Sequence, residues 1–245
     1  MAAVMPILTA TGIKRHFGGL KAVDGIDFSL NEGEIRAIIG PNGAGKTTFV
    51  SLLSGRTPVG EGTIRFRDQD ITKLPAFHRV RLGIAYTFQI TNIYQSLSVA
   101  ENVRIAALGR AQRDRSIKLD IEGETAAALS AVGLSGREYD RAGEMAYGHQ
   151  RLLEVAMGLA LQPSLLILDE PTQGLADAEI ENFCALVRRV SANATVLLIE
   201  HNMDVVMKLA DRITVLNRGC VLAEGTPAEI SANAEVQAAY LGTGA

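Results

Sequence analysis

The chain has 245 residues, of which 47% are hydrophobic, and a formal net charge of −3. These values are typical of a folded globular protein, and they argue against a disordered chain or a strongly basic nucleic-acid-binding protein. No apolar run approaches the roughly 18 residues of a bilayer-spanning helix, the first ten residues lack the features of a signal peptide, and two cysteines are too few for a disulfide framework.

The first third of the sequence has three short apolar runs, at residues 7–13, 26–30 and 35–39, which predict strands. A glycine-rich loop follows the third run and precedes a predicted helix at residues 47–53. The loop comprises Gly40, Pro41, Asn42, Gly43, Ala44, Gly45, Lys46 and Thr47, followed by Thr48.

This loop has the spacing and the strand–helix context of a phosphate-binding loop. Its glycines allow backbone N–H groups to surround an anion, and the helix N-terminus adds positive potential. In such a loop Lys46 reaches the β- and γ-phosphates of a nucleotide and the Thr47 hydroxyl binds Mg²⁺. The alternative is a glycine-rich turn that happens to precede a helix.

The middle of the sequence shifts from a mixed pattern to a helical one. The predicted elements are a strand at 62–66, a turn at 67–70, a helix at 75–82, a strand at 84–88, and helices at 98–108 and 121–132. Ser98 and Glu101 form a capping-box pattern, and Gly133 stops the second long helix. The charged residues 110–118 are expected to form a loop or a frayed helix end. We therefore predict a helical subdomain inserted into an α/β core.

The second half returns to alternating helices and strands. The predicted elements are a helix at 149–161, a strand at 165–168, a helix at 176–190, a strand at 195–199, a helix at 203–209, a hairpin at 213–216 and 221–223, and closing helices at 227–231 and 234–241. The uninterrupted apolar strand at 165–168 is typical of a buried parallel strand.

Two carboxylates, Asp169 and Glu170, follow that strand directly. Ligands bind at the carboxyl ends of strands in an open α/β sheet. We predict that Asp169 holds Mg²⁺ and that Glu170 is the general base for the water that attacks the γ-phosphate. The alternative, an acidic loop after a strand, loses weight because a phosphate loop lies upstream.

A third motif, residues 146–151, opens the helix before Asp169 and resembles the signature motif of ATP-binding-cassette ATPases. Other positions match the same family: Gln89 the Q-loop glutamine, His201 the switch histidine and Phe17 the aromatic residue that stacks on adenine. This resemblance covers nearly the whole sequence, whereas a metabolic P-loop kinase would not need the motif at 146–151.

The resemblance implies a P-loop NTPase core of α/β class with an N-terminal antiparallel β lobe (about 1–92 and 160–225 together), an inserted helical subdomain (about 93–159) and C-terminal helices (226–245). It implies two ATP molecules between two cassettes, each held by one phosphate loop and by the partner's signature. The implied catalytic residues are Lys46, Gln89, Glu170 and His201. The implied Mg²⁺ ligands are Thr47, Gln89 and Asp169. The implied nucleotide-binding residues are Phe17, the loop residues 40–48, Ala146, Tyr147, Gly148 and His149.

The sequence departs from the common family pattern at three positions. Ala146 replaces a serine, which removes one possible γ-phosphate donor, and Tyr147 replaces a glycine. Ala176 stands where the D-loop usually has an aspartate, which puts a contact across the dimer in doubt unless the neighbouring Asp177 substitutes for it. None of these changes touches the predicted catalytic residues, so we expect ATP hydrolysis.

The signature, together with residues 17–23, 87–89, 199–203 and 235–242, looks like that of the ATPases of branched-chain amino acid importers, and the chain resembles the longer of the two ATPases in such an importer. This resemblance implies a second ATPase subunit in a homo- or heterodimer, two membrane permeases, a periplasmic solute-binding protein and no nucleic acid partner. It also implies a location at the cytoplasmic face of the inner membrane. Two alternatives stay open: the ATPase of a lipopolysaccharide exporter and a soluble cassette ATPase without a transport role. The apolar residues of segment 90–97 are expected to receive a permease helix, or else to pack inside the helical subdomain.

Overall fold

The computed structural model describes residues 6–87, 92–113 and 119–241, and their strands form two sheets. The smaller sheet is antiparallel, with the order β2-β1-β4-β5. Its strands are β1 (Pro6–Phe17), β2 (Leu20–Asn31), β4 (Glu61–Phe66) and β5 (Gln69–Asp70).

The larger sheet has the order β10-β9-β3-β8-β7-β6, and all its neighbours are parallel except β10 and β9. Its strands are β3 (Ile35–Ile39), β6 (Ile84–Tyr86), β7 (Leu165–Asp169), β8 (Thr195–Ile199), β9 (Arg212–Asn217) and β10 (Cys220–Gly225). Every residue of β3, β7 and β8 is buried. Burial on both faces explains why these strands have continuous apolar runs rather than alternating patterns.

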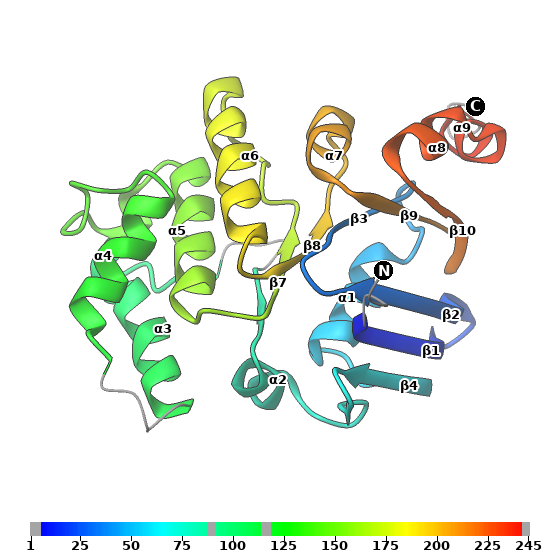
Figure 1. Cartoon of the computed structure of the whole chain (residues 1–245), viewed down its shortest axis with the longest axis horizontal. Helices are drawn as coiled ribbons and strands as arrows, with labels where there is room; N and C mark the ends of the chain where they lie inside the picture. Colours follow the sequence, from blue (N-terminus) through cyan, green and yellow to red (C-terminus); the bar gives the residue numbers. More distant parts are fainter. Residues whose placement is uncertain (1–5, 88–91, 114–118, 242–245) are drawn as a thin grey trace.

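The helices are α1 (Lys46–Ser54), α2 (Ala76–Leu82), α3 (Val99–Arg113), α4 (Ile121–Ala131), α5 (Tyr147–Ala160), α6 (Asp177–Ser191), α7 (Met203–Leu209), α8 (Pro227–Ala232) and α9 (Ala234–Leu241). Helices α3, α4 and α5 pack against one another and lie on the opposite side of the larger sheet from β1, β2 and β4 (Figure 1). The division of the sequence near residues 92 and 160 stays a prediction.

Several predicted elements extend or end differently in the structure. β1 and β2 are longer than expected and meet in a hairpin, where Phe17 pairs with Leu20. Residues 69–70 pair with β4 as β5, so the predicted turn is shorter. The predicted strand at 84–88 ends at Tyr86, and Phe88 lies outside the described residues.

The expectation of a loop at 110–118 is wrong for its first four residues, because α3 continues to Arg113. The Arg110 guanidinium lies 3.0 Å from the Glu124 carboxylate, which ties the last turns of α3 to α4. At the other end of α3 the capping box is confirmed. The Ser98 N–H donates to the Glu101 carboxylate at 2.7 Å, and the Glu101 N–H donates to the Ser98 hydroxyl at 3.2 Å.

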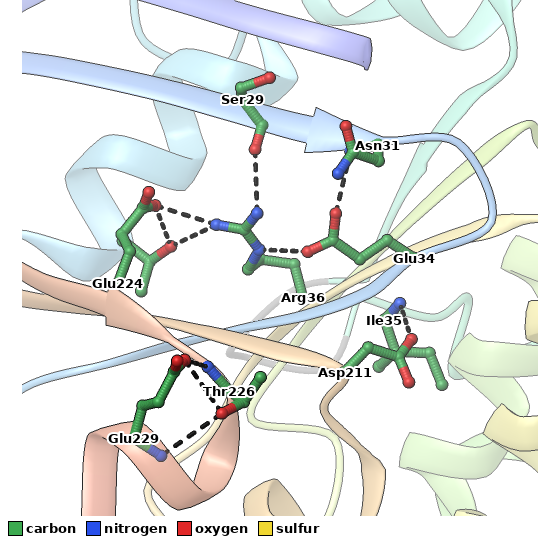
Figure 2. Close-up of polar contacts among 10 residues, drawn as sticks. Ser29, Asn31, Glu34, Ile35, Arg36, Asp211, Glu224, Thr226 and Glu229 are labelled. Atoms are coloured by element: carbon green, nitrogen blue, oxygen red, sulfur yellow. Dashed lines mark hydrogen bonds and ion pairs between the residues drawn. The ribbon is translucent and has the colours of Figure 1, made fainter. Parts of the chain in front are cut away.

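A buried arginine on β3 of the larger sheet connects this strand to β2 of the smaller sheet and to the hairpin of β9 and β10 (Figure 2). The Arg36 guanidinium donates to the Glu34 carboxylate at 2.5 Å and to the Glu224 carboxylate at 2.9 Å. It also donates to the Thr214 hydroxyl at 2.9 Å and to the Ser29 carbonyl at 3.1 Å. Because β3 leads directly into the glycine-rich loop, this cluster fixes the strand that carries the loop.

None of the helices in the described ranges is long and apolar enough to cross a membrane.

Candidate nucleotide site

The predicted site residues follow neighbouring strands of the larger sheet. In the order β3-β8-β7 the strands end at the glycine-rich loop, at His201 and at Asp169 with Glu170. Since these strands are parallel, their carboxyl ends lie at one edge of the sheet. The fold therefore brings three motifs that are up to about 160 residues apart in the sequence to one place.

Two glycines of the loop are required by close backbone contacts. Gly40 has φ 152°, and a Cβ there would lie 2.2 Å from the Leu216 carbonyl oxygen. Gly45, the N-cap of α1, has φ 97°, and a Cβ there would lie 2.2 Å from the Ala22 carbonyl oxygen. The loop thus packs closely against the backbones of β9 and β2. Helix α1 begins at the end of the loop, and its N-cap, Gly45, offers no side-chain hydrogen bond to the first N–H groups of the helix. Such a helix start is suited to binding a phosphate.

Lys46 is the first residue of α1, and its side chain turns back over the loop. Its ammonium group donates to the Gly40 carbonyl at 2.6 Å and to the Pro41 carbonyl at 3.1 Å. Burial lowers the pKa of Lys46, whereas the carboxylates of Glu170 and Asp169 oppose that shift. The lysine thus lies at the loop and within the field of both acidic residues.

Asp169 ends β7 and has no exposed surface. One carboxylate oxygen, Oδ2, accepts a hydrogen bond from the Tyr86 hydroxyl at 2.5 Å. The other, Oδ1, is buried and has no hydrogen-bond partner among the described residues. Burial raises the pKa of Asp169, which the Tyr86 hydrogen bond partly offsets. A buried carboxylate oxygen without a donor fits a cation, and carboxylate and hydroxyl oxygens are ligands that Mg²⁺ prefers.

Glu170 and His201 lie close to each other beside Asp169. The His201 Nδ1 is 3.9 Å from the Glu170 carboxylate. The Glu170 side chain is 19% exposed and that of His201 is 64% exposed, so both are accessible to a ligand. Glu170 has φ 49°, a left-handed conformation that non-glycine residues seldom adopt. Its N–H donates to the Ile199 carbonyl at 2.9 Å, which anchors it to β8.

The predicted signature residues form the start of α5, two residues earlier than the helix expected at 149. Ala146 is the N-cap and supplies no side-chain hydrogen bond, while Tyr147 is 45% exposed. Gly148 is buried, and a Cβ there would lie 2.8 Å from the Gly174 carbonyl oxygen. Its lack of a side chain is therefore needed for packing against the loop after Glu170.

His149 is held on both ring nitrogens. Its Nδ1 lies 2.8 Å from an Arg137 guanidinium nitrogen, and its Nε2 lies 3.2 Å from the Glu179 carboxylate. Since arginine only donates, Nδ1 accepts and Nε2 carries the proton. These contacts connect the start of α5 to α6, and a contact of His149 with nucleotide stays a prediction.

Phe17 lies at the end of β1, with 47% of its surface exposed. The Arg15 guanidinium lies 4.9 Å from the centre of its ring. An exposed ring outside the core is available for stacking. Of the remaining predicted residues, Ala176 is the N-cap of α6, and Gln89 lies outside the described residues.

A family model described as "ABC transporter" matches residues 23–173, more than half of the sequence. The chain belongs to the ABC transporter family. It is the ATP-binding and ATP-hydrolysing cassette of such a transporter, as its motifs predicted. A second model, described as "Branched-chain amino acid ATP-binding cassette transporter", matches residues 220–245.

The similarity to known proteins extends over almost the whole cassette. The high-affinity branched-chain amino acid transport ATP-binding protein LivG of Escherichia coli K12 is 38% identical, over 97% of this chain and 98% of LivG. The corresponding BraF of Pseudomonas aeruginosa is 37% identical over the same shares. A crystal structure of the ADP conformation of an ATP-binding cassette of an ABC transporter has a TM-score of 0.85 at 29% identity, over 97% of this chain and 99% of that chain. The predicted cassette fold is confirmed.

Three residues that support the cassette site were missed in the sequence. The Tyr86 hydroxyl donates a hydrogen bond to the Asp169 carboxylate. Its position at the end of the strand before Gln89 could have indicated in the sequence that Tyr86 lies near the site. Glu200, beside His201, is 1% exposed and accepts four hydrogen bonds.

The third, Arg79 on α2, is 1% exposed and donates to the carbonyls of Leu52 and Leu53 at the end of α1. Burial lowers the pKa of Arg79 to about 10. A cation at a helix C-terminus is stabilising. This contact could not be predicted from the sequence, because Arg79 and Leu53 are 26 positions apart and no local pattern connects them.

Proposed function

We propose that this cassette is the ATP-hydrolysing subunit of an importer for branched-chain amino acids. The observation that carries this proposal is the combination of 38% identity to LivG over 97% of the sequence with the match of residues 220–245 to the second family model. That match supports the cargo class because it lies outside the general cassette match, which ends at residue 173.

The site geometry supports a division of roles among the residues of this cassette. Lys46, now bonded to loop carbonyls, exchanges those contacts for the β- and γ-phosphates of ATP. Thr47 and Asp169 hold Mg²⁺, with Gln89 as a further ligand. When bound, Mg²⁺ neutralises charge on the β- and γ-phosphate oxygens.

The water that attacks the γ-phosphate is oriented by two side chains. Glu170 accepts its proton as general base, and His201 hydrogen-bonds the γ-phosphate and keeps the reacting groups in line. The distance of 3.9 Å between His201 Nδ1 and the Glu170 carboxylate supports a joint role of these two side chains. Phe17 stacks on adenine.

A second cassette completes each site. Residues Ala146 to His149 of one cassette face the nucleotide held by the phosphate loop of the other, in a homo- or heterodimer. The exposure of the Tyr147 side chain supports such a contact. ATP binding closes the dimer and hydrolysis releases it, so the cassette alternates between two states that bind ATP with different affinity.

The permeases bind at a groove between the helices α2, α3 and α5. A cavity of about 390 Å³ lies there, lined by apolar residues that include Val80, Tyr94, Ile105 and Met157. In the predicted contact segment 90–97, the Tyr94 side chain is 53% exposed and that of Ile93 is partly buried against the core. Residues 90 and 91 lie outside the described residues. This attachment places the cassette at the cytoplasmic face of the membrane, and a periplasmic binding protein delivers the solute to the permeases.

Uptake in cells tests the cargo. Cells that lack their own copy are complemented with the wild-type cassette or with Glu170→Gln and given labelled leucine, isoleucine, valine, urea or glutamate. We expect uptake of the three branched-chain amino acids with the wild type only. Selective uptake of another solute would change the cargo, and intact ATPase activity without any restored uptake would favour a lipid exporter or a role outside transport.

A further inference from the structure

A buried carboxylate lies between the two catalytic loops. Glu200 follows β8 directly, with 1% of its surface exposed. It precedes His201 in the sequence, and its side chain reaches the loop that follows Glu170. A carboxylate is buried at a cost unless several donors compensate for the lost water.

Each oxygen of Glu200 binds a different loop. Oε1 accepts the Thr172 hydroxyl at 2.5 Å and the Thr172 N–H at 3.0 Å. Oε2 accepts the His201 N–H at 3.1 Å and the Asn202 N–H at 3.3 Å. One carboxylate therefore connects the residue two positions after Glu170 to the backbone of His201.

These four donors require a side chain in which both terminal atoms accept hydrogen bonds. An ionised carboxylate has about four acceptor positions and no donor, whereas an amide has one oxygen and one NH₂ group. A glutamine that bonds Thr172 through its oxygen would direct its NH₂ at the N–H groups of His201 and Asn202. The arrangement is therefore specific to a carboxylate.

We propose that Glu200 is a positioning residue for ATP hydrolysis. It holds the loop of Glu170 and the loop of His201 at a fixed separation, so that the general base and the γ-phosphate contact stay aligned. A backbone hydrogen bond from the Glu170 N–H to the Ile199 carbonyl fixes the start of the first loop, and Glu200 fixes its continuation. This inference rests on the proposed roles of Glu170 and His201.

The test compares steady-state ATP hydrolysis and ATP binding for Glu200→Gln, Thr172→Val and Thr172→Ser in the full-length protein. Small misplacements of catalytic groups cost up to about 100-fold in rate. We expect kcat to fall about 10- to 100-fold in Glu200→Gln and Thr172→Val, with KM and the ATP dissociation constant within about twofold of the wild type. Thr172→Ser, which keeps the hydroxyl donor, should recover most of the rate.

Matched controls separate positioning from folding. Glu181→Gln makes the same chemical change at an exposed glutamate on α6 that binds Lys208, and should leave kcat unchanged. The kcat of the double variant Glu200→Gln with Thr172→Val should be little lower than that of either single variant, because the two substitutions break the same connection. A wild-type kcat for Glu200→Gln, or a loss of ATP binding and thermal stability in parallel with kcat, would overturn the positioning role. A wild-type cassette without ATPase activity would instead overturn the proposed function.

Discussion

Asp169→Asn should stabilise the nucleotide-free cassette while abolishing its activity. The Asp169 carboxylate is fully buried, and its Oδ1 has no hydrogen-bond partner in the described part of the protein. A buried polar group without a partner costs about 1–3 kcal/mol, and more when it is charged. Asparagine removes the charge and keeps one oxygen for the Tyr86 hydroxyl. We expect the free energy of unfolding to rise by about 1 kcal/mol, or Tm by about 2–4 °C.

The sign of the effect depends on pH. Folding raises the pKa of Asp169 above its ordinary 3.8, so the charged carboxylate destabilises the folded state at neutral pH. This cost is fully present above the raised pKa and disappears as the pH falls below 3.8. The stability advantage of Asp169→Asn should therefore shrink as the pH is lowered from 7 toward 4.

The assay is thermal and urea unfolding without nucleotide, with Asp68→Asn as a control at an exposed turn, where stability should change little. Mg²⁺ with ATP should raise the Tm of the wild type through binding to the folded state, but should raise that of Asp169→Asn much less. An Asp169→Asn cassette that is less stable than the wild type at pH 7 would refute the reasoning about the unpaired oxygen.

Lys46→Ala should weaken ATP binding about 10- to 100-fold, since a hydrogen bond to a charged group contributes about 1.5–3 kcal/mol, and isothermal titration would show it. Phe17→Ala should weaken ATP by about 1–3 kcal/mol if the ring stacks on the base; an unchanged dissociation constant would exclude stacking. Gly148→Ala places a methyl group 2.8 Å from the Gly174 oxygen and should cost about 1–3 kcal/mol in urea unfolding, whereas Gly109→Ala on α3, where the nearest atom is 3.9 Å away, should not destabilise the cassette. Arg36→Met leaves the Glu34 and Glu224 carboxylates without their cation and should cost about 3–5 kcal/mol, while Lys14→Met, at an exposed ion pair, should change stability little.

The parts of the fold that were predicted correctly have strong local patterns. β3, β7 and β8 are buried on both faces, so their apolar runs marked them clearly. The lengths of β1 and β2 were missed because the parts outside the predicted ranges, residues 14–17 and 20–25, contain several polar residues and are mostly exposed or only partly buried. The extension of α3 beyond residue 108 was missed because it is supported by an ion pair between Arg110 and Glu124, and Glu124 belongs to another helix, α4.

For the site, spacing predicted a phosphate loop, and the parallel strands bring this loop to the same edge of the sheet as Asp169, Glu170 and His201. The supporting contacts of Tyr86 and Glu200 were not predictable, because each depends on which strands become neighbours. The need for Gly148 to pack against Gly174 was also hidden, since the two glycines are 26 residues apart and come together only in the fold.

The measurement to make on the hydrolysis site is the rate of phosphate release by Glu170→Gln compared with the wild type, alongside MgATP binding by both. A general base contributes about 10²–10⁴-fold, so phosphate release should fall by at least 100-fold while MgATP binds as tightly as before. Phosphate release by Glu170→Gln at the wild-type rate would contradict the assignment of Glu170, and with it the proposed arrangement of water, His201 and phosphate loop at this edge of the sheet.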